Sequence, residues 1–237
     1  MLRQLDRNLW VAVQPLKYLG LEVGTRMTIV GLSDGTLAVI SPIKITTEIK
    51  RELDTIGTVA HIIAPNLYHY LYAGECKSLY PKATFWGTIG LQEKQPELTV
   101  DKVIQPDKSE LWRELAGIFF NGFKTLGPNG FDTLNEWVFL HLDSRTLILT
   151  DTAFHYDGSF PWVKQLVARV LGCYDALTPS VLEKIATTDK KTIRKSVDAV
   201  LQWDFDRVVM AHGSVIETGG KEMFKHGYRK FLGDKSL

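Results

Sequence analysis

Three predicted strand ends carry side chains that could bind a metal ion. The apolar stretch "HIIA" runs into "PNLYHY", which presents Asn66 and His69. The stretch "TLILT" ends at Asp151, with His155 four residues later, and "RVVMA" ends at His212. Sites in open α/β sheets form in the crevice beyond the carboxyl ends of strands. These groups therefore meet only if the sheet brings the three strand ends together.

Imidazole and carboxylate groups in such a set suit zinc, iron or manganese, and the carboxylate lowers the cost of burying a dication. A bound ion can lower the pKa of water to about 7 and supply the nucleophile for hydrolysis. We therefore predict His69, Asp151 and His212 as metal-binding and catalytic residues, with His69 as a ligand or a general base. A structural alternative stays open, in which Asp151 caps the turn-rich segment "DTAFHYDG" and His155 covers that turn.

The elements that must position these residues follow a repeated order of hairpin, helix and strand. Apolar runs around "SDG" and "DSR" predict the two hairpins, and capping residues, helical periodicity and terminal glycines predict the helices. The predicted hairpins span 27–42 and 135–151, the helices 46–57, 73–81, 160–172 and 190–203, and the strands 58–65 and 206–213.

Other segments are less regular. The polar stretch 90–110 has no periodicity, the apolar stretch 110–123 fits a helix or an extended strand, and "GPNG" at 127–130 is a turn. The basic run "DKKTIRKS" at 189–196 is typical of a solvated helix face. Two strand-rich halves with helices on one side of each predict an α/β fold of two sheets between helix layers. One domain over residues 1–237 is the simplest organisation.

Composition narrows the class of protein. The 237 residues are 45% hydrophobic and 23% charged, as in globular proteins, and 28 basic against 27 acidic residues argue against nucleic-acid binding. Cys76 and Cys173 lie far apart in sequence, which indicates reduced thiols rather than a disulfide framework. The N-terminus lacks a secretory apolar core, and no apolar run approaches the ~20 residues of a membrane span. We expect a cytoplasmic protein with a small-molecule substrate or ligand.

The remaining histidines and the tryptophans have structural interpretations. His61 and His141 lie within predicted strands and are expected to pack there, while His226 lies on a basic, aromatic C-terminal helix and is expected at the surface. The six tryptophans are expected in the core, although they could also form an interface, which leaves a homodimer open. Their positions are Trp10, Trp86, Trp112, Trp137, Trp162 and Trp203.

Three segments together resemble the metallo-β-lactamase fold, and most closely a domain-of-unknown-function family of metallo-β-lactamase-like proteins. "GTLAVISP" is similar to that fold's early strand ending at the site. "SRTLILTDTAF" resembles its late hairpin, whose metal-bridging aspartate corresponds to Asp151. "VVMAHGSV" resembles the terminal strand, whose last histidine ligand corresponds to His212. The resemblance runs from about residue 8 to 232 and implies a four-layered αβ/βα sandwich with its site at one sheet edge.

The chain departs from the metal-binding signature of that fold. The motif H-x-H-x-D-H falls on four residues that do not retain it, although His69 lies one residue from two of these positions; they are Asn66, Tyr68, Tyr70 and Leu71. The fold's next histidine has no counterpart, since residues 121–136 offer only Asp132 and Glu136. The standard two-zinc site is therefore absent, and tyrosine, with a reference pKa of about 10, is a poor replacement ligand.

Two functions follow from this pattern. The first is a mononuclear metal-dependent hydrolase that binds one divalent ion through Asp151, His212 and His69, with an acid as a fourth ligand. The second is a protein that binds no metal and holds a small molecule or a protein partner in the former active-site cleft, because an aromatic lining favours ligand burial. The predicted cleft lining comprises Asn66, Tyr68, Tyr70, Glu136 and His155.

Overall fold

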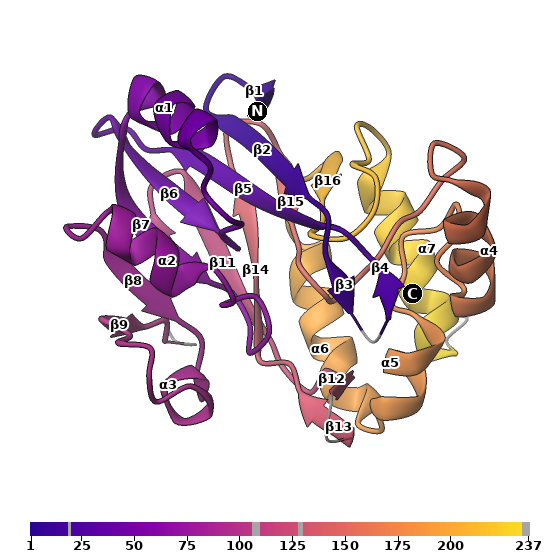
Figure 1. Cartoon of the computed structure of the whole chain (residues 1–237). Helices are drawn as coiled ribbons and strands as arrows, with labels where there is room; N and C mark the ends of the chain where they lie inside the picture. Colours follow the sequence, from indigo (N-terminus) through magenta and orange to yellow (C-terminus); the bar gives the residue numbers. More distant parts are fainter. Residues whose placement is uncertain (19, 106–109, 128–129, 234–237) are drawn as a thin grey trace.

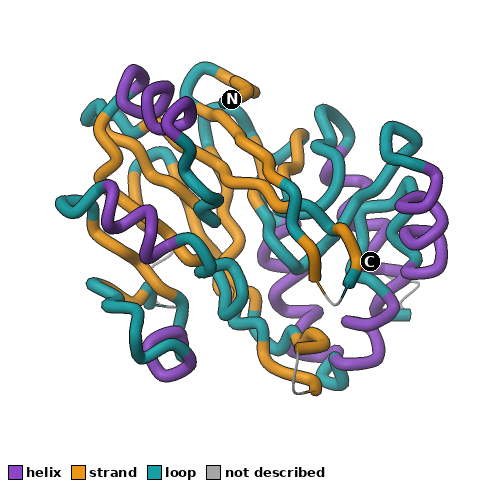
Figure 2. The backbone as a smooth tube through the Cα atoms, in the orientation of Figure 1, coloured by secondary structure: helices purple, strands orange, loops and turns teal. Residues whose placement is uncertain are grey.

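Two β-sheets lie face to face between two layers of helices. The computed structural model describes residues 1–18, 20–105, 110–127 and 130–233 (Figure 1). Strands occupy the middle of the molecule, and helices cover the outer side of each sheet (Figure 2). This arrangement confirms the predicted α/β sandwich.

The first sheet has seven strands in the order β1-β2-β5-β6-β7-β8-β9. The pairs from β1 to β6 are antiparallel and those from β6 to β9 are parallel. Helices α1 and α2 lie on its outer face (Figure 1), and a short helix α3 follows β8. The strands are β1 (Arg3–Asp6), β2 (Leu9–Gln14), β5 (Thr25–Gly31), β6 (Thr36–Ile40), β7 (Thr58–Ala64), β8 (Thr84–Gly87) and β9 (Lys102–Val103), and the helices α1 (Thr47–Ile56), α2 (Ala73–Leu79) and α3 (Leu91–Lys94).

The second sheet has the strand order β10-β11-β14-β15-β16; the pair β15–β16 is parallel and the other three described pairs are antiparallel. Four helices belong to this half, and two short hairpins, β3–β4 and β12–β13, stand apart from both sheets. The sheet comprises β10 (Glu110–Trp112), β11 (Leu115–Phe120), β14 (Glu136–His141), β15 (Thr146–Ile148) and β16 (Arg207–Val209); the helices are α4 (Trp162–Leu171), α5 (Val181–Ala186), α6 (Lys190–Leu201) and α7 (Gly220–Leu232); the hairpins are β3 (Lys17–Tyr18) with β4 (Leu21–Glu22) and β12 (Lys124–Gly127) with β13 (Gly130–Thr133).

The central strands β5 and β14 are buried on both faces, and side chains that alternate along each strand belong to different core clusters. In β5, Ile29 packs toward the helices of its own half, while Val30 faces the other sheet. In β14, Val138 packs in the cluster with α6 and α7, while Phe139 lies in the cluster between the sheets. Successive strand residues point to opposite faces, so continuous apolar runs are what two-sided burial requires.

Most predicted elements are confirmed. Thr46 caps α1 by accepting a hydrogen bond from the backbone N of Ile49 at 3.3 Å, and Gly172 ends α4 with a φ of +81°. The stretch left open at 110–123 is extended and forms β10 and β11. The strands β1 and β2 and the helix α5 were not predicted from the sequence, and the stretch 90–110 contains α3 and β9. Residues 128–129 of the predicted turn lie outside the described residues.

The histidines outside the predicted site behave as expected. His141 is 1% exposed and its Nδ1 contacts Ser144 Oγ at 2.6 Å, His61 packs against Trp86 and Trp112, and His226 is exposed on α7. Among the described residues, no helix combines the length and the apolar character that crossing a membrane requires.

Truncating Phe139 to alanine tests the layer between the sheets. Its side chain is fully buried, so Phe139→Ala should lower the free energy of unfolding by about 3–5 kcal/mol, measured by urea denaturation. Leu142→Ala is the matched control, because Leu142 is 44% exposed in the adjoining turn and should change stability by less than about 0.5 kcal/mol. Equal losses in the two variants would contradict the proposed packing.

Candidate metal centre

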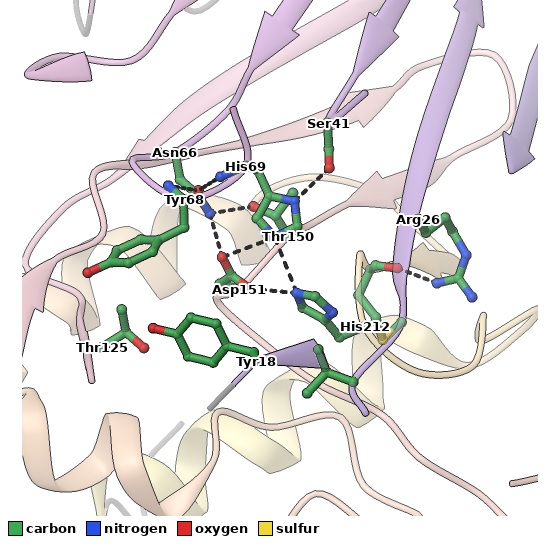
Figure 3. A network of polar contacts seen from close by, with 12 residues as sticks. Tyr18, Arg26, Ser41, Asn66, Tyr68, His69, Thr125, Thr150, Asp151 and His212 are labelled. Carbon is green, nitrogen blue, oxygen red and sulfur yellow. Dashed lines mark hydrogen bonds and ion pairs between the residues drawn. The ribbon is translucent and has the colours of Figure 1, made fainter. Parts of the chain in front are cut away.

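The side chains of His69, Asp151 and His212 meet at one point (Figure 3). His69 Nε2 lies 3.2 Å from Asp151 Oδ2, and His212 Nε2 lies 3.1 Å from Asp151 Oδ1. The two Nε2 atoms are 3.2 Å apart. The three side chains are only 8%, 14% and 9% exposed, respectively. Two nitrogen donors and a carboxylate therefore converge in a nearly closed space.

Each member of this trio follows a strand, and the strands come from both sheets. His69 follows β7 of the seven-stranded sheet, whereas Asp151 and His212 follow β15 and β16 of the five-stranded sheet. Because β15 and β16 run parallel, their carboxyl ends reach the same sheet edge. The packing of one sheet on the other then places the end of β7 beside them. The predicted convergence of three strand ends is thus what the fold produces.

The imidazole of His212 is held in one tautomer. Its Nδ1 lies 2.6 Å from the carbonyl oxygen of Gly24, which can only accept, so Nδ1 carries a proton. In the neutral ring, the lone pair of Nε2 then faces the Asp151 carboxylate and the other imidazole. Lone pairs at these distances require a cation between them, either a proton or a metal ion.

The imidazole of His69 is also oriented through its second nitrogen. Ser41 directly follows β6, and its Oγ lies 2.6 Å from His69 Nδ1. Metal-binding histidines commonly engage their remaining nitrogen in this way, which fixes the ring and raises its basicity. Both Nε2 atoms are thereby directed to Asp151 by contacts on the far side of their rings.

Asn66 connects the His69 loop to Asp151. Its amide nitrogen lies 2.8 Å from Asp151 Oδ2, and its Oδ1 accepts from the backbone N–H groups of Tyr68 and His69, both at 2.8 Å. The side chain is fully buried. Asn66 thus fixes the turn at 66–69 relative to the Asp151 carboxylate. This is a positioning role, whereas the same position of the metal-binding motif holds a ligand.

Glu136 lies next to the cluster, because its carboxylate contacts both the Asn66 amide and the backbone N–H of Asp151. Its Oε1 accepts from the backbone N and the hydroxyl of Thr152 and from Thr150 N, and its Oε2 accepts from Asp151 N at 2.7 Å and Asn66 Nδ2 at 3.0 Å. Both carboxylate oxygens of Glu136 therefore accept hydrogen bonds from the loop at 150–152, and Oε2 also accepts from Asn66. The other acid considered, Asp132, has Oδ2 3.1 Å from both Tyr68 Oη and Lys94 Nζ.

The same contacts decide against Asp151 as a turn cap. The backbone N–H groups at positions 150–152 donate to Glu136, whereas the Asp151 carboxylate faces Asn66 and the two imidazoles. His155, predicted to line the cleft, is 6% exposed, and its Nδ1 lies 3.4 Å from the carbonyl oxygen of Ser214. Its side chain is outside the three-residue cluster.

Charge complementarity in the cluster is strong. Burial opposes ionisation of Asp151, but the neighbouring His69 and His212 hold the pKa of its carboxyl far below the ordinary range. Burial also disfavours a charged His69, yet the Asp151 carboxylate raises the pKa of that imidazole above its ordinary value. The site therefore keeps a negative carboxylate and favours positive charge beside it.

Arg26 holds the His212 loop in place. Its guanidinium donates to the carbonyl oxygens of Met210 and of Gly213, the latter at 2.6 Å. Burial lowers the pKa of Arg26 to about 10, so it stays charged at neutral pH. Sequence reasoning missed Arg26, Ser41 and Gly24; the signal for Arg26 was a lone charge inside the apolar run "TRMTIVG".

The aromatic residues at the former ligand positions bond elsewhere. Tyr68 Oη donates to Asp132 Oδ2, and Tyr70 Oη accepts from Gln95 Nε2 at 2.7 Å. Leu71 is 61% exposed. Tyr18, which sequence reasoning did not consider, lies close to the cluster in Figure 3, and its hydroxyl donates to the carbonyl oxygen of Leu126 at 2.8 Å.

The fold and the location of this cluster define a protein of the metallo-β-lactamase fold. A metallo-β-lactamase from Pontibacter korlensis superposes with a TM-score of 0.66 over 99% of each chain at 13% identity. A metallo-β-lactamase from Hirschia baltica gives 0.66 over 100% of this chain and 99% of the other at 11% identity. FIM-1 from Pseudomonas aeruginosa, solved in a mono-zinc form, gives 0.64 over 98% and 96% at 8% identity. At these identities the similarity concerns the fold alone.

Residues 6–177 match the family described as "Domain of unknown function (DUF4336)", and the chain belongs to this family. A comparison with curated proteins finds no sequence relative.

Replacing Arg26 tests the anchoring of the His212 loop. Arg26→Met leaves two carbonyl oxygens without their donor in a buried site, so the free energy of unfolding should fall by roughly 2–4 kcal/mol in urea denaturation. Arg3→Met is the control, because the Arg3–Glu217 ion pair is exposed and should contribute less than about 1 kcal/mol. A loss no larger than in the control would contradict the anchoring role.

Proposed function

We propose that this protein is a hydrolase that uses one divalent metal ion held by His69, Asp151 and His212. The observation that carries the proposal is the meeting of two Nε2 atoms and a carboxylate within 3.2 Å, with the other nitrogen of each ring held by Gly24 or Ser41. A metal ion at this point would be held by the lone pairs of both Nε2 atoms and by the Asp151 carboxylate together.

The donor set fits zinc, iron or manganese. Imidazole nitrogen and carboxylate oxygen suit these ions, and one carboxylate leaves a net positive charge on the filled site. Three protein ligands are typical of catalytic zinc sites, in which the fourth position is kept for water or substrate. Glu136 and Asp132 are engaged by protein donors, which supports three protein ligands rather than four.

When bound, the ion supplies Lewis acidity, which polarises a carbonyl or phosphoryl group and makes water more acidic. The chain's own residues prepare the site for it. His69 and His212 present Nε2, Gly24 and Ser41 fix their rings, and Glu136 and Asn66 hold Asp151. Because His69 Nε2 points at Asp151 as His212 Nε2 does, we assign His69 as a ligand rather than as a general base.

The alternative function, binding of a small molecule or a partner without a metal, is less well supported by the hydrogen bonds of the tyrosines. It was motivated by an aromatic cleft lining, but the hydroxyls of Tyr68 and Tyr70 are bonded to Asp132 and Gln95 outside the cluster. The cytoplasmic location remains part of the proposal. It is supported by Cys76 and Cys173, which are free thiols at 0% and 1% exposure.

Metal analysis tests the ligand set. Protein purified without chelator should carry about one zinc, iron or manganese ion per chain by inductively coupled plasma mass spectrometry. His212→Ala and Asp151→Asn should lose most of it, and His226→Ala, which alters an exposed histidine on α7, should keep it. Sub-stoichiometric metal together with no thermal shift from added zinc, iron or manganese would refute the site.

Hydrolysis tests the chemistry separately. The metal-loaded protein should cleave at least one of p-nitrophenyl acetate, bis(p-nitrophenyl) phosphate and nitrocefin, because one Lewis-acid centre serves acyl and phosphoryl groups alike. His69→Ala should reduce the rate at least ~100-fold, as removal of an electrostatic stabiliser does. A metal-loaded protein inactive on all three, with a ligand whose binding survives chelation, would favour the binding-only function.

A further inference from the structure

The outer surface of α4 and α5 carries a row of large apolar side chains that the chain leaves uncovered. Trp162 is 75% exposed, and two of its helical neighbours, Leu166 and Val170, are 54% and 73% exposed. They follow one another at a spacing of four, so they form one ridge along α4. The ridge is completed by Val163 on α4 and by Val181 and Ile185 on α5.

The two helices adjoin where α4 ends and α5 begins. A Cβ placed on Gly172, which ends α4, would lie 3.7 Å from a methyl carbon of Val181, at the start of α5. The opposite side of α4 is anchored, because Ala168 is buried in a cluster with Tyr156 and Cys173. In Figure 1, α4 lies at the edge of the molecule, away from both sheets. Contiguous apolar patches of this kind mark interaction sites, unlike single exposed residues.

From this surface we infer that the α4–α5 face binds the same face of a second copy of the chain. Leu166 lies midway between Trp162 and Val170 in the helix. If two copies of α4 cross antiparallel with Leu166 on the two-fold axis, Trp162 lies opposite Val170 of the second copy. The ridge is then self-complementary, with a large side chain against a small one at each end, as an isologous interface requires.

The charges on α4 fit a second copy better than an anionic lipid surface. Lys164 Nζ lies 3.6 Å from Glu22 Oε2, and the Arg169 guanidinium stacks 3.5 Å from the centre of the Tyr174 ring. Both cations of α4 are therefore engaged within the chain. Arg169 lies three residues after Leu166 and Val163 three before it. In the two-fold arrangement, Arg169 of one copy therefore lies opposite Val163 of the other, and no two cations of α4 face each other.

The size of the patch is adequate. The six side chains expose apolar area on the order of 500 Å² per copy. A standard interface removes about 800 Å² per partner from water, so this ridge alone supplies more than half of that area. Of the six tryptophans, Trp137 is 1% exposed in the core, whereas Trp162 is free to take part in an interface.

Sedimentation velocity on the full chain over low to high micromolar concentration tests the inference. The mass should rise from 26.8 kDa toward twice that value. Leu166→Glu should weaken association at least tenfold, since it places two carboxylates together at the axis. Leu142→Glu, a substitution in an exposed turn, should leave association unchanged. Circular dichroism melts of both variants confirm that each is folded.

A cross-link locates the axis. Under mild oxidation, Leu166→Cys should form a covalent dimer and Leu142→Cys should not, because the native Cys76 and Cys173 are buried. A protein that is monomeric at all concentrations, or a dimer indifferent to Leu166→Glu, overturns the inference. Binding of a monomer to phosphatidylcholine–phosphatidylglycerol vesicles, lost in Trp162→Ser, would also overturn it and assign the face to a lipid surface.

Discussion

A carboxylate that is almost removed from water must be surrounded by hydrogen-bond donors or positive charge, and Asp151 imposes this requirement on the whole centre. The two imidazoles and Asn66 lie against its oxygens, and the backbone N–H of Asp151 is bonded to Glu136. These partners come from three separate stretches of the chain: the turn after β7, which carries both Asn66 and His69, strand β14 with Glu136, and the loop after β16 with His212. The charge of one side chain therefore connects segments that are far apart in sequence.

Glu136 supports the residues around Asp151, since it accepts hydrogen bonds from Asn66 and from the backbone N–H of Asp151. It is fully buried and satisfies the backbone N–H groups of the loop at 150–152, which would otherwise be unpaired where β15 ends. Arg26 holds the His212 loop as a donor where Glu136 is an acceptor. Its guanidinium donates to the carbonyl oxygens of Met210 and Gly213 on either side of the histidine. One buried anion and one buried cation thus fix the two loops that the second sheet contributes.

The fold also explains how His69, Asp151 and His212 converge although the ligand motif is changed. Asn66 occupies the first position of the altered motif and now holds Asp151 and the turn after β7. That turn directs His69 into the site, although His69 is not at a ligand position of the motif.

The sequence by itself determined the local elements and the identity of the three converging side chains. Turn residues, caps and apolar runs specified both central hairpins and helices α1, α4 and α6, because these signals act within a few residues. It also indicated that Asp151, His69 and His212 follow strands. It did not reveal β1 and β2, whose pairing partners decide their strand character, or the extended conformation of β11, which pairs with β14.

Only the tertiary structure decided the roles of the neighbouring polar residues. In the sequence, Glu136 and Asp132 were equivalent as the two acids of the segment 121–136, but in the fold each carboxylate accepts hydrogen bonds from other protein groups. Across more than 180 residues of sequence, the Gly24 carbonyl contacts His212 and Arg26 contacts the carbonyl oxygens of Met210 and Gly213 beside it. Ser41 contacts His69 from the end of another strand. Such contacts depend on how two sheets pack, which the spacing of residues along the chain does not encode.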